Sequence, residues 1–117
     1  MAGYLTTHVL DTARGVPAEG IVIELYAIES ETRTYLHSRT TNDDGRTNAP
    51  VLPKEEFRPG TYELVFHVGA YFDAQGQAGS TPRFLDVVPL RFGMSEETHY
   101  HVPLLVSPYS YSTYRGS

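Results

Sequence analysis

Hydrophobic and polar residues alternate with a period of two in several short runs of this chain. The clearest run is residues 21–28, where Ile21, Ile23 and Leu25 share one face and Glu24 lies on the other. A period of two is that of a β-strand with one buried face. Similar runs, or runs of polar strand-forming residues, cover residues 5–10, 32–40, 62–68, 84–92, 99–106 and 109–114.

Turn-forming residues separate these runs at short intervals. Residues 42–45 read Asn-Asp-Asp-Gly, a strong turn signal, and the prolines of residues 50–59 predict an irregular segment. Residues 11–18 are predicted to form an ordered loop, and residues 69–75 a helix of two turns. The polar run at 32–40 is expected at a sheet edge. Seven to eight short strands predict an all-β sandwich of two sheets, in a single domain spanning residues 1–117.

Composition removes several classes of function. A net charge of −5 disfavours a nucleic-acid-binding protein, which would carry a basic stripe. The absence of cysteine excludes disulfides, a thiolate nucleophile and thiolate-bound metals. No apolar run approaches the roughly 20 residues of a membrane helix, and the first residues do not resemble a signal peptide. We therefore expect no nucleic-acid or membrane partner and a cytoplasmic location, with the peroxisome as the alternative.

The last nineteen residues predict two strands and an ordered tail. His99 and His101 are two residues apart and so share one face of their strand. Pro103 cannot donate to a strand ladder, which predicts an edge position or a bulge there. The chain then ends in Tyr114, Arg115, Gly116 and Ser117, which would bring a guanidinium and a carboxylate to a defined place.

Other polar residues are candidates for a site, although each also has a structural interpretation. His8 lies in a predicted strand, where a half-buried histidine bonded within its sheet is the simpler alternative. Arg46 follows the turn at residues 42–45 and could be a solvated turn residue, and His101 could equally be structural. His37 and His67 are interpreted as ordinary strand histidines.

Two kinds of chemistry are disfavoured. His8, His99 and His101 could together supply three imidazole ligands for zinc. However, Arg46 nearby would repel a cation, and no acidic residue is adjacent to orient the ligands. The chain also lacks the Gly-x-Ser-x-Gly motif of a serine hydrolase. We expect neither a metal nor an organic cofactor.

Three segments resemble the 5-hydroxyisourate hydrolases, also called transthyretin-related proteins. They are LTTHVLDTARGVPAEGIVIELY at residues 5–26, TNDDGRT at 41–47 and HYHVPLLVSPYSYSTYRGS at 99–117. The terminal Tyr-Arg-Gly-Ser is the most specific element, because transthyretins lack it and carry Lys at the position of His8. Residues 75–91 match only loosely, and His99 corresponds to no fixed position of the family.

The resemblance implies a transthyretin-like sandwich, an assembly and a reaction. The assembly would be a homotetramer with active-site channels between its dimers. The reaction would be hydrolysis of 5-hydroxyisourate, a purine-derived small molecule, to 2-oxo-4-hydroxy-4-carboxy-5-ureidoimidazoline. The competing hypothesis is a transthyretin-like carrier that binds a small molecule in the same channels without catalysis.

The resemblance also implies roles for individual residues. His8 and His101 would orient and deprotonate the attacking water, with Ser117 nearby, and which imidazole is the base stays open. Arg46 would bind the substrate or its oxyanion through its planar fork of donors. The substrate-binding residues implied are Tyr114, Arg115 and Gly116.

Overall fold

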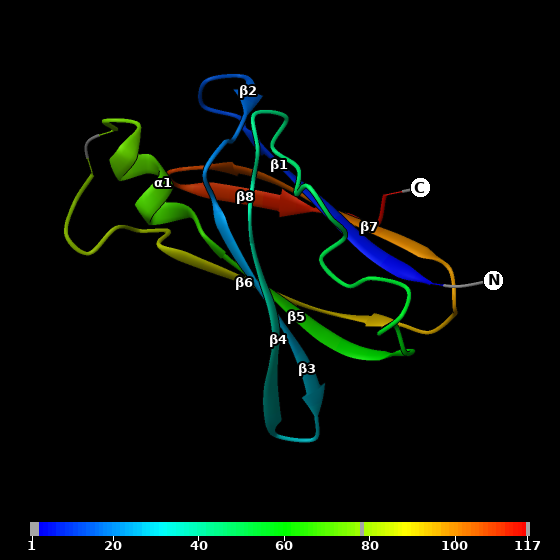
Figure 1. The fold of residues 1–117 in the computed structure, drawn as a ribbon. Helices are drawn as coiled ribbons and strands as arrows, with labels where there is room; N and C mark the ends of the chain where they lie inside the picture. Colours follow the sequence, from blue (N-terminus) through cyan, green and yellow to red (C-terminus); the bar gives the residue numbers. More distant parts are fainter. Residues whose placement is uncertain (1–2, 78, 117) are drawn as a thin grey trace.

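The alternating runs form two sheets that pack face to face (Figure 1). The computed structural model describes residues 3–77 and 79–116. Within them, the elements are β1 (Tyr4–Asp11), β2 (Val16–Pro17), β3 (Val22–Glu29), β4 (Thr32–Thr40), β5 (Gly60–His67), α1 (Val68–Ala74), β6 (Val87–Met94), β7 (His99–Ser107) and β8 (Ser110–Thr113). The predicted all-β sandwich with one short helix is confirmed.

The first sheet has the strand order β2-β1-β7-β8 and joins the two ends of the chain. β1 and β7 are parallel, in a register that pairs Thr6 with His101. Leu5 and Val9 of β1 point inward and are fully buried, whereas Thr6 and His8 lie on the outer face and are partly exposed. Polar side chains of the first and last long strands therefore stand in adjacent rows on the outside of this sheet.

The second sheet has the order β4-β3-β5-β6, which confirms that the polar strand β4 is at an edge. Its inner face carries Ile23 and Leu25 of β3 and Leu64 and Phe66 of β5, all with no exposed surface. These side chains pack against the inner face of the first sheet in one hydrophobic core. Burial of this apolar surface is the main force that holds the sheets together.

The strand predicted at residues 84–92 is displaced along the chain to Val87–Met94. β6 pairs with β5, and Val87 lies opposite His67, the last residue of β5. The chain turns into α1 at Val68, so the residues before Val87 have no strand to pair with. The helix itself begins one residue before its predicted start.

Pro103 lies in a central strand, not at the predicted edge or bulge, because β7 pairs with both β1 and β8. Backbone pairing with β8 begins only at Leu104, opposite Thr113. The Pro103 carbonyl points to that side and accepts a hydrogen bond from Thr113 Oγ1 (2.7 Å). The ring nitrogen of Pro103 therefore lies just outside the paired segment of β7 and β8. A residue there does not have to donate a backbone hydrogen bond to β8, so a proline is tolerated.

Two elements are attached to the end of β1. The short strand β2, in the segment predicted as an ordered loop, pairs Val16 with Asp11. The buried carboxylate of Asp11 accepts a hydrogen bond from the Tyr71 hydroxyl of α1 (2.8 Å). Burial and this carboxylate raise the pKa of Tyr71 to about 12, so the phenol stays a donor. No helix of the described residues is long and apolar enough to cross a membrane.

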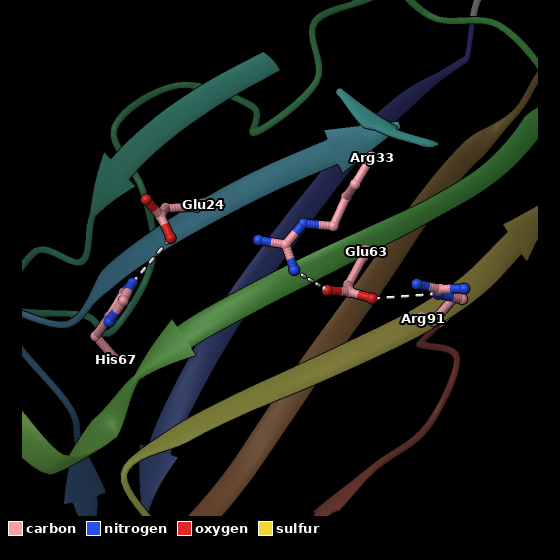
Figure 2. Close-up of polar contacts among 5 residues, drawn as sticks. All are labelled: Glu24, Arg33, Glu63, His67 and Arg91. Carbon is pink, nitrogen blue, oxygen red and sulfur yellow. Dashed lines mark hydrogen bonds and ion pairs between the residues drawn. The ribbon is translucent and has the colours of Figure 1, made fainter. Parts of the chain in front are cut away.

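The outer face of the second sheet carries a network of paired charges (Figure 2). Glu63 of β5 accepts hydrogen bonds from Arg33 of β4 (3.0 Å) and Arg91 of β6 (3.1 Å). Along the same face, His67 lies 2.9 Å from a carboxylate oxygen of Glu24. These contacts link all four strands of the sheet, and each carboxylate is matched by a basic group.

Candidate active site

The outer face of the first sheet holds a pair of histidines. His8 Nδ1 of β1 lies 2.7 Å from His101 Nε2 of β7. The rings are stacked, with centroids 4.8 Å apart and planes inclined by 20°. The parallel register explains the contact, since His8 stands two residues beyond Thr6, the partner of His101. The structure thus joins the first and last predicted site histidines directly.

Two further residues continue this pair. Thr6 Oγ1 lies 2.7 Å from His101 Nδ1 and 2.7 Å from His99 Nε2. His99 is exposed and stacks on the ring of Tyr4, with centroids 4.1 Å apart. Sequence reasoning missed Thr6 and left His99 out. The two-residue spacing on each strand was visible, but the parallel register that brings the strands together was not predicted.

The turn between β4 and β5 places Arg46 beside His8, with which it forms an isolated β-bridge. Gly45 has φ +72°, and a Cβ there would lie 2.4 Å from the Val9 carbonyl oxygen, so a side chain could not be accommodated. Asn42 Oδ1 accepts a hydrogen bond from the Arg46 amide (3.2 Å). The backbone thus fixes the base of an arginine whose side chain is exposed.

The tail returns to the site at Gly116. Its amide donates to the His101 carbonyl (2.7 Å), which restores strand pairing beyond the end of β8. A Cβ at Gly116 would lie 2.9 Å from His101 Cδ2, closer than side-chain carbons approach. Only glycine therefore lets the tail pass this close to the imidazole. Ser117 lies outside the described residues.

Tyr114 and Arg115 lie between β8 and Gly116 and turn to a different pocket. This pocket, of about 500 Å³, adjoins β6 and the inner face of β7. The Arg115 guanidinium carbon is 4.3 Å from the centroid of the Tyr100 ring. Within one chain, these two predicted substrate-binding residues are thus not brought together with His8 and Arg46.

A second pocket lies beside the imidazoles of His99 and His101. It measures about 430 Å³, and Thr6, Arg46, His99 and His101 contribute to its wall. Its other lining residues are Tyr4, Thr7, Thr47, Asn48, Ala49 and Pro50. Among the described residues, no group of three or more His, Asp or Glu is arranged to hold a metal ion.

The surroundings keep both histidines of the pair neutral. Burial, and then the positive charge of Arg46, lower the pKa of His8. Burial lowers the pKa of His101 to about 4, with further contributions from His8, Arg46 and His99. Near neutral pH, the pair is therefore uncharged and can accept a proton.

The strand order and the paired imidazoles beside an arginine describe a transthyretin-like sandwich with a polar site on one outer face. The chain belongs to the HIUase/Transthyretin family, which it matches over residues 5–116. A 5-hydroxyisourate hydrolase of Mesorhizobium japonicum is 59% identical, over 98% of this chain and 93% of its own. That of Pseudomonas aeruginosa is 58% identical, over 98% and 92%.

Solved structures give the same fold. (S)-allantoin synthase matches with a TM-score of 0.92 and 48% identity over 99% of this chain, which spans only 44% of that longer protein. Klebsiella pneumoniae 5-hydroxyisourate hydrolase has a TM-score of 0.82 and 33% identity, over 98% of this chain and 99% of its own. Sea bream transthyretin in complex with thyroxine matches with a TM-score of 0.84 and 26% identity, over 96% of this chain and 93% of its own. The chain is thus more similar in sequence to these enzymes than to that transthyretin.

Proposed function

We propose that this protein hydrolyses 5-hydroxyisourate to 2-oxo-4-hydroxy-4-carboxy-5-ureidoimidazoline. The observation that carries the proposal is the neutral pair of His8 and His101 beside the exposed cation of Arg46. A base and a fixed positive charge are what the attack of water on a carbonyl requires. The relatives named as 5-hydroxyisourate hydrolases, which match nearly the whole chain, support this choice of substrate.

In the proposed mechanism, water attacks the C6 carbonyl and the histidine pair takes its proton. A C–O bond forms, the ring C–N bond breaks, and the proton passes to the departing nitrogen. A positioned base contributes roughly 10²–10⁴-fold to such a step. Arg46 stabilises the negative oxygen of the tetrahedral intermediate, and one such donor is worth roughly 10²–10³-fold. The reaction uses neither a metal nor an organic cofactor.

We further propose that the enzyme is a homotetramer with its active sites between dimers. The outer face that bears His8 continues into Leu10 and Leu105, which pair with each other and stay partly exposed in the single chain. Covering this part of the face with another subunit would bury the apolar surface of Leu10 and Leu105, which lie toward the end of β1 and β7 away from His99. The site would lie in the cytoplasm, with the peroxisome as the alternative.

The tail completes the proposed site. Gly116 holds it against His101, and Tyr114 and Arg115 would bind the substrate ring by stacking and hydrogen bonds. Because these two side chains line the adjoining pocket within one chain, assembly of the tetramer must bring them to the substrate. Ser117 would assist the histidine pair with its hydroxyl or its carboxylate.

The decay of 5-hydroxyisourate absorbance tests the proposal. Urate oxidase generates the compound from urate, and its spontaneous decay is slow, so the protein should accelerate the decay in proportion to its concentration. His8→Ala and Arg46→Ala should each lose at least about 100-fold in rate while folding and assembling normally. Deletion of residues 115–117 should also abolish turnover.

A transthyretin-like carrier is the alternative, since the sea bream transthyretin structure holds thyroxine on the same fold. A folded tetramer that leaves the decay of 5-hydroxyisourate unchanged would contradict the hydrolase proposal. Thyroxine binding to that tetramer, measured by calorimetry, would then favour the carrier.

A further inference from the structure

The hydrogen bonds of the histidine pair do not end at the pair. They run from His8 Nδ1 to His101 Nε2, from His101 Nδ1 to Thr6 Oγ1, and from Thr6 Oγ1 to His99 Nε2. Each of the three contacts is 2.7 Å long. His99 is exposed, so one end of this row meets solvent. At the other end, His8 Nε2 has no hydrogen-bond partner within residues 3–77 and 79–116.

A neutral row of this kind has two consistent arrangements of its protons. In the first, His8 donates to His101, His101 donates to Thr6, and the Thr6 hydroxyl donates to His99. His8 Nε2 then carries a lone pair and can act as a base. In the second, every bond is reversed, and His8 Nε2 carries a proton that it can donate. Because each link holds one proton, the state of His8 Nε2 is tied to the tautomer of His101.

We propose that Thr6 and His99 complete a proton path between His8 and solvent, in which Thr6 sets the tautomer of His101. The inference rests on the proposed hydrolysis for its role in turnover. Thr6 is a positioning residue that acts through His101, and His99 exchanges protons with the solvent. The base that touches the attacking water is His8, through Nε2.

The path balances protons through both halves of the reaction. When water attacks, its proton moves to His8 Nε2, each bond of the row reverses, and His99 Nδ1 releases a proton to solvent. When the ring C–N bond breaks, His8 Nε2–H protonates the departing nitrogen, and His99 takes a proton back. The row returns to its first arrangement, and no imidazole in its interior has to hold a charge.

The electrostatics of the site favour the first arrangement at rest. The charged and titratable groups that act on His101 are His8 on β1, Arg46 on the turn and His99 on β7. The positive charge of Arg46 lowers the pKa of His8, and such a charge favours a lone pair over an N–H group on that ring. Because burial lowers the pKa of His101 to about 4, His101 is neutral near neutral pH, as both arrangements of the row require.

Replacement of Thr6 gives the first test. Thr6→Val keeps the β-branched shape but removes the hydroxyl, and should lower kcat about 10-fold with KM nearly unchanged. Thr6→Ser keeps the hydroxyl and should restore most of the rate. Equal rates for the valine and serine variants would overturn the role of Thr6.

His99 gives a second readout that a purely structural role would not affect. His99→Phe retains an aromatic ring for stacking on Tyr4 but removes both nitrogens. Its kcat should fall several-fold in dilute buffer and recover as imidazole buffer is added, because the buffer replaces the lost exchange with solvent. His37→Gln removes a histidine remote from this row and is the matched control, with no buffer dependence expected. If kcat of His99→Phe does not change with the concentration of imidazole buffer, the proposed proton exchange between His99 and solvent is wrong.

A nitrogen-15 NMR measurement of the histidine rings separates this inference from the proposed hydrolysis. In the wild type, His101 should carry its proton on Nδ1. In Thr6→Val, that nitrogen loses its acceptor, so the proton should move to Nε2. If Thr6→Val shifts the tautomer but the wild-type protein does not hydrolyse 5-hydroxyisourate, the hydrogen-bonded row is supported and the proposed hydrolysis is contradicted. If the wild type is active but the tautomer of His101 is the same in Thr6→Val, the proposed role of Thr6 is contradicted and the proposed hydrolysis is not.

Discussion

The outer faces of the two sheets differ in how they treat charge. On the second sheet, Glu63 is only 6% exposed, yet it binds both Arg33 and Arg91 (Figure 2). On the first sheet, the corresponding surface carries His8 and His101, which bond to each other, and no carboxylate of residues 3–77 and 79–116 is among their hydrogen-bond partners. One face therefore satisfies its charges internally, whereas the other leaves a base and a cation beside each other.

The histidines show the same contrast within one residue type. His37 lies 2.8 Å from Glu56, and His67 lies 2.9 Å from Glu24. The rings of His8 and His101 instead lie against each other, and burial and the positive charge of Arg46 lower the pKa of both. The partner, and not the presence of histidine in a strand, distinguishes the proposed site from the rest of the surface.

The difference explains why one face suits chemistry. An ion pair such as that of Arg33 and Glu63 already has its counter-charge, so it gains little by binding an anion. Arg46 forms no salt bridge among the described residues and remains available for a developing negative charge. A positive charge without an internal partner is tolerated here because the Arg46 side chain is exposed to water.

The largest expected effect comes from giving the first face the charge pattern of the second. Arg46→Glu replaces the cation beside His8 with a carboxylate, so the pKa of His8 and of His101 should rise. The rate of enzyme-catalysed 5-hydroxyisourate decay near neutral pH should fall by about 1,000-fold, because the oxyanion loses its donor and meets a negative charge instead. NMR titration of the imidazoles and the absorbance assay measure the two effects.

Arg46→Gln separates the two contributions. It removes the positive charge without adding a negative one, so the imidazole pKa values should rise less than in the glutamate variant. Indistinguishable titration curves for wild type and Arg46→Glu would show that Arg46 does not control the protonation of the pair.

Local patterns were sufficient to predict most of the fold. Alternation at residues 21–28 predicted β3, and the turn signals predicted its neighbours. The prediction was less accurate where the bounds of a strand depend on its pairing partner. β6 begins at Val87 because β5, with which it pairs, ends at His67. Pro103 was wrongly assigned to an edge or bulge, because its own sequence does not reveal where β8 stops.

The site was predicted less completely, and for a related reason. The resemblance pointed to His8, Arg46 and His101, and the structure brings these together. Thr6 was not singled out, because a threonine in a strand has no distinctive pattern of its own. Its importance depends on the parallel pairing with His101, a contact across 95 positions of the chain. The roles proposed for all these residues stay predictions until the variants are measured.

A smaller effect is expected in the pH dependence of stability. The pKa of His101 is about 4 in the folded protein, below the ordinary value of 6.5 that we assign to the unfolded chain. The unfolded chain therefore binds protons more readily as the pH falls from 6.5 toward 4, and stability is lost over that range. When the pH is lowered from 7 to 5, the free energy of unfolding of His101→Phe should fall by about 1 kcal/mol less than that of wild type. The difference is modest because solvent screens the partly exposed site.

Urea unfolding at both pH values, at one fixed protein concentration, measures this difference. If the free energy of unfolding falls equally in wild type and His101→Phe, burial and positive neighbours do not lower the pKa of His101 as proposed.

The smallest effect is expected on the second face. Glu63→Gln keeps the size of the side chain but removes the charge shared by Arg33 and Arg91. Both arginines are about half exposed, so water replaces much of what they lose, and the free energy of unfolding should fall by only about 0.5 kcal/mol. Salt should narrow the gap between the variant and wild type, since screening weakens surface ion pairs. Hydrolysis per folded molecule should be unchanged, whereas a loss of rate comparable to that of Arg46→Gln would show that the two faces are not independent.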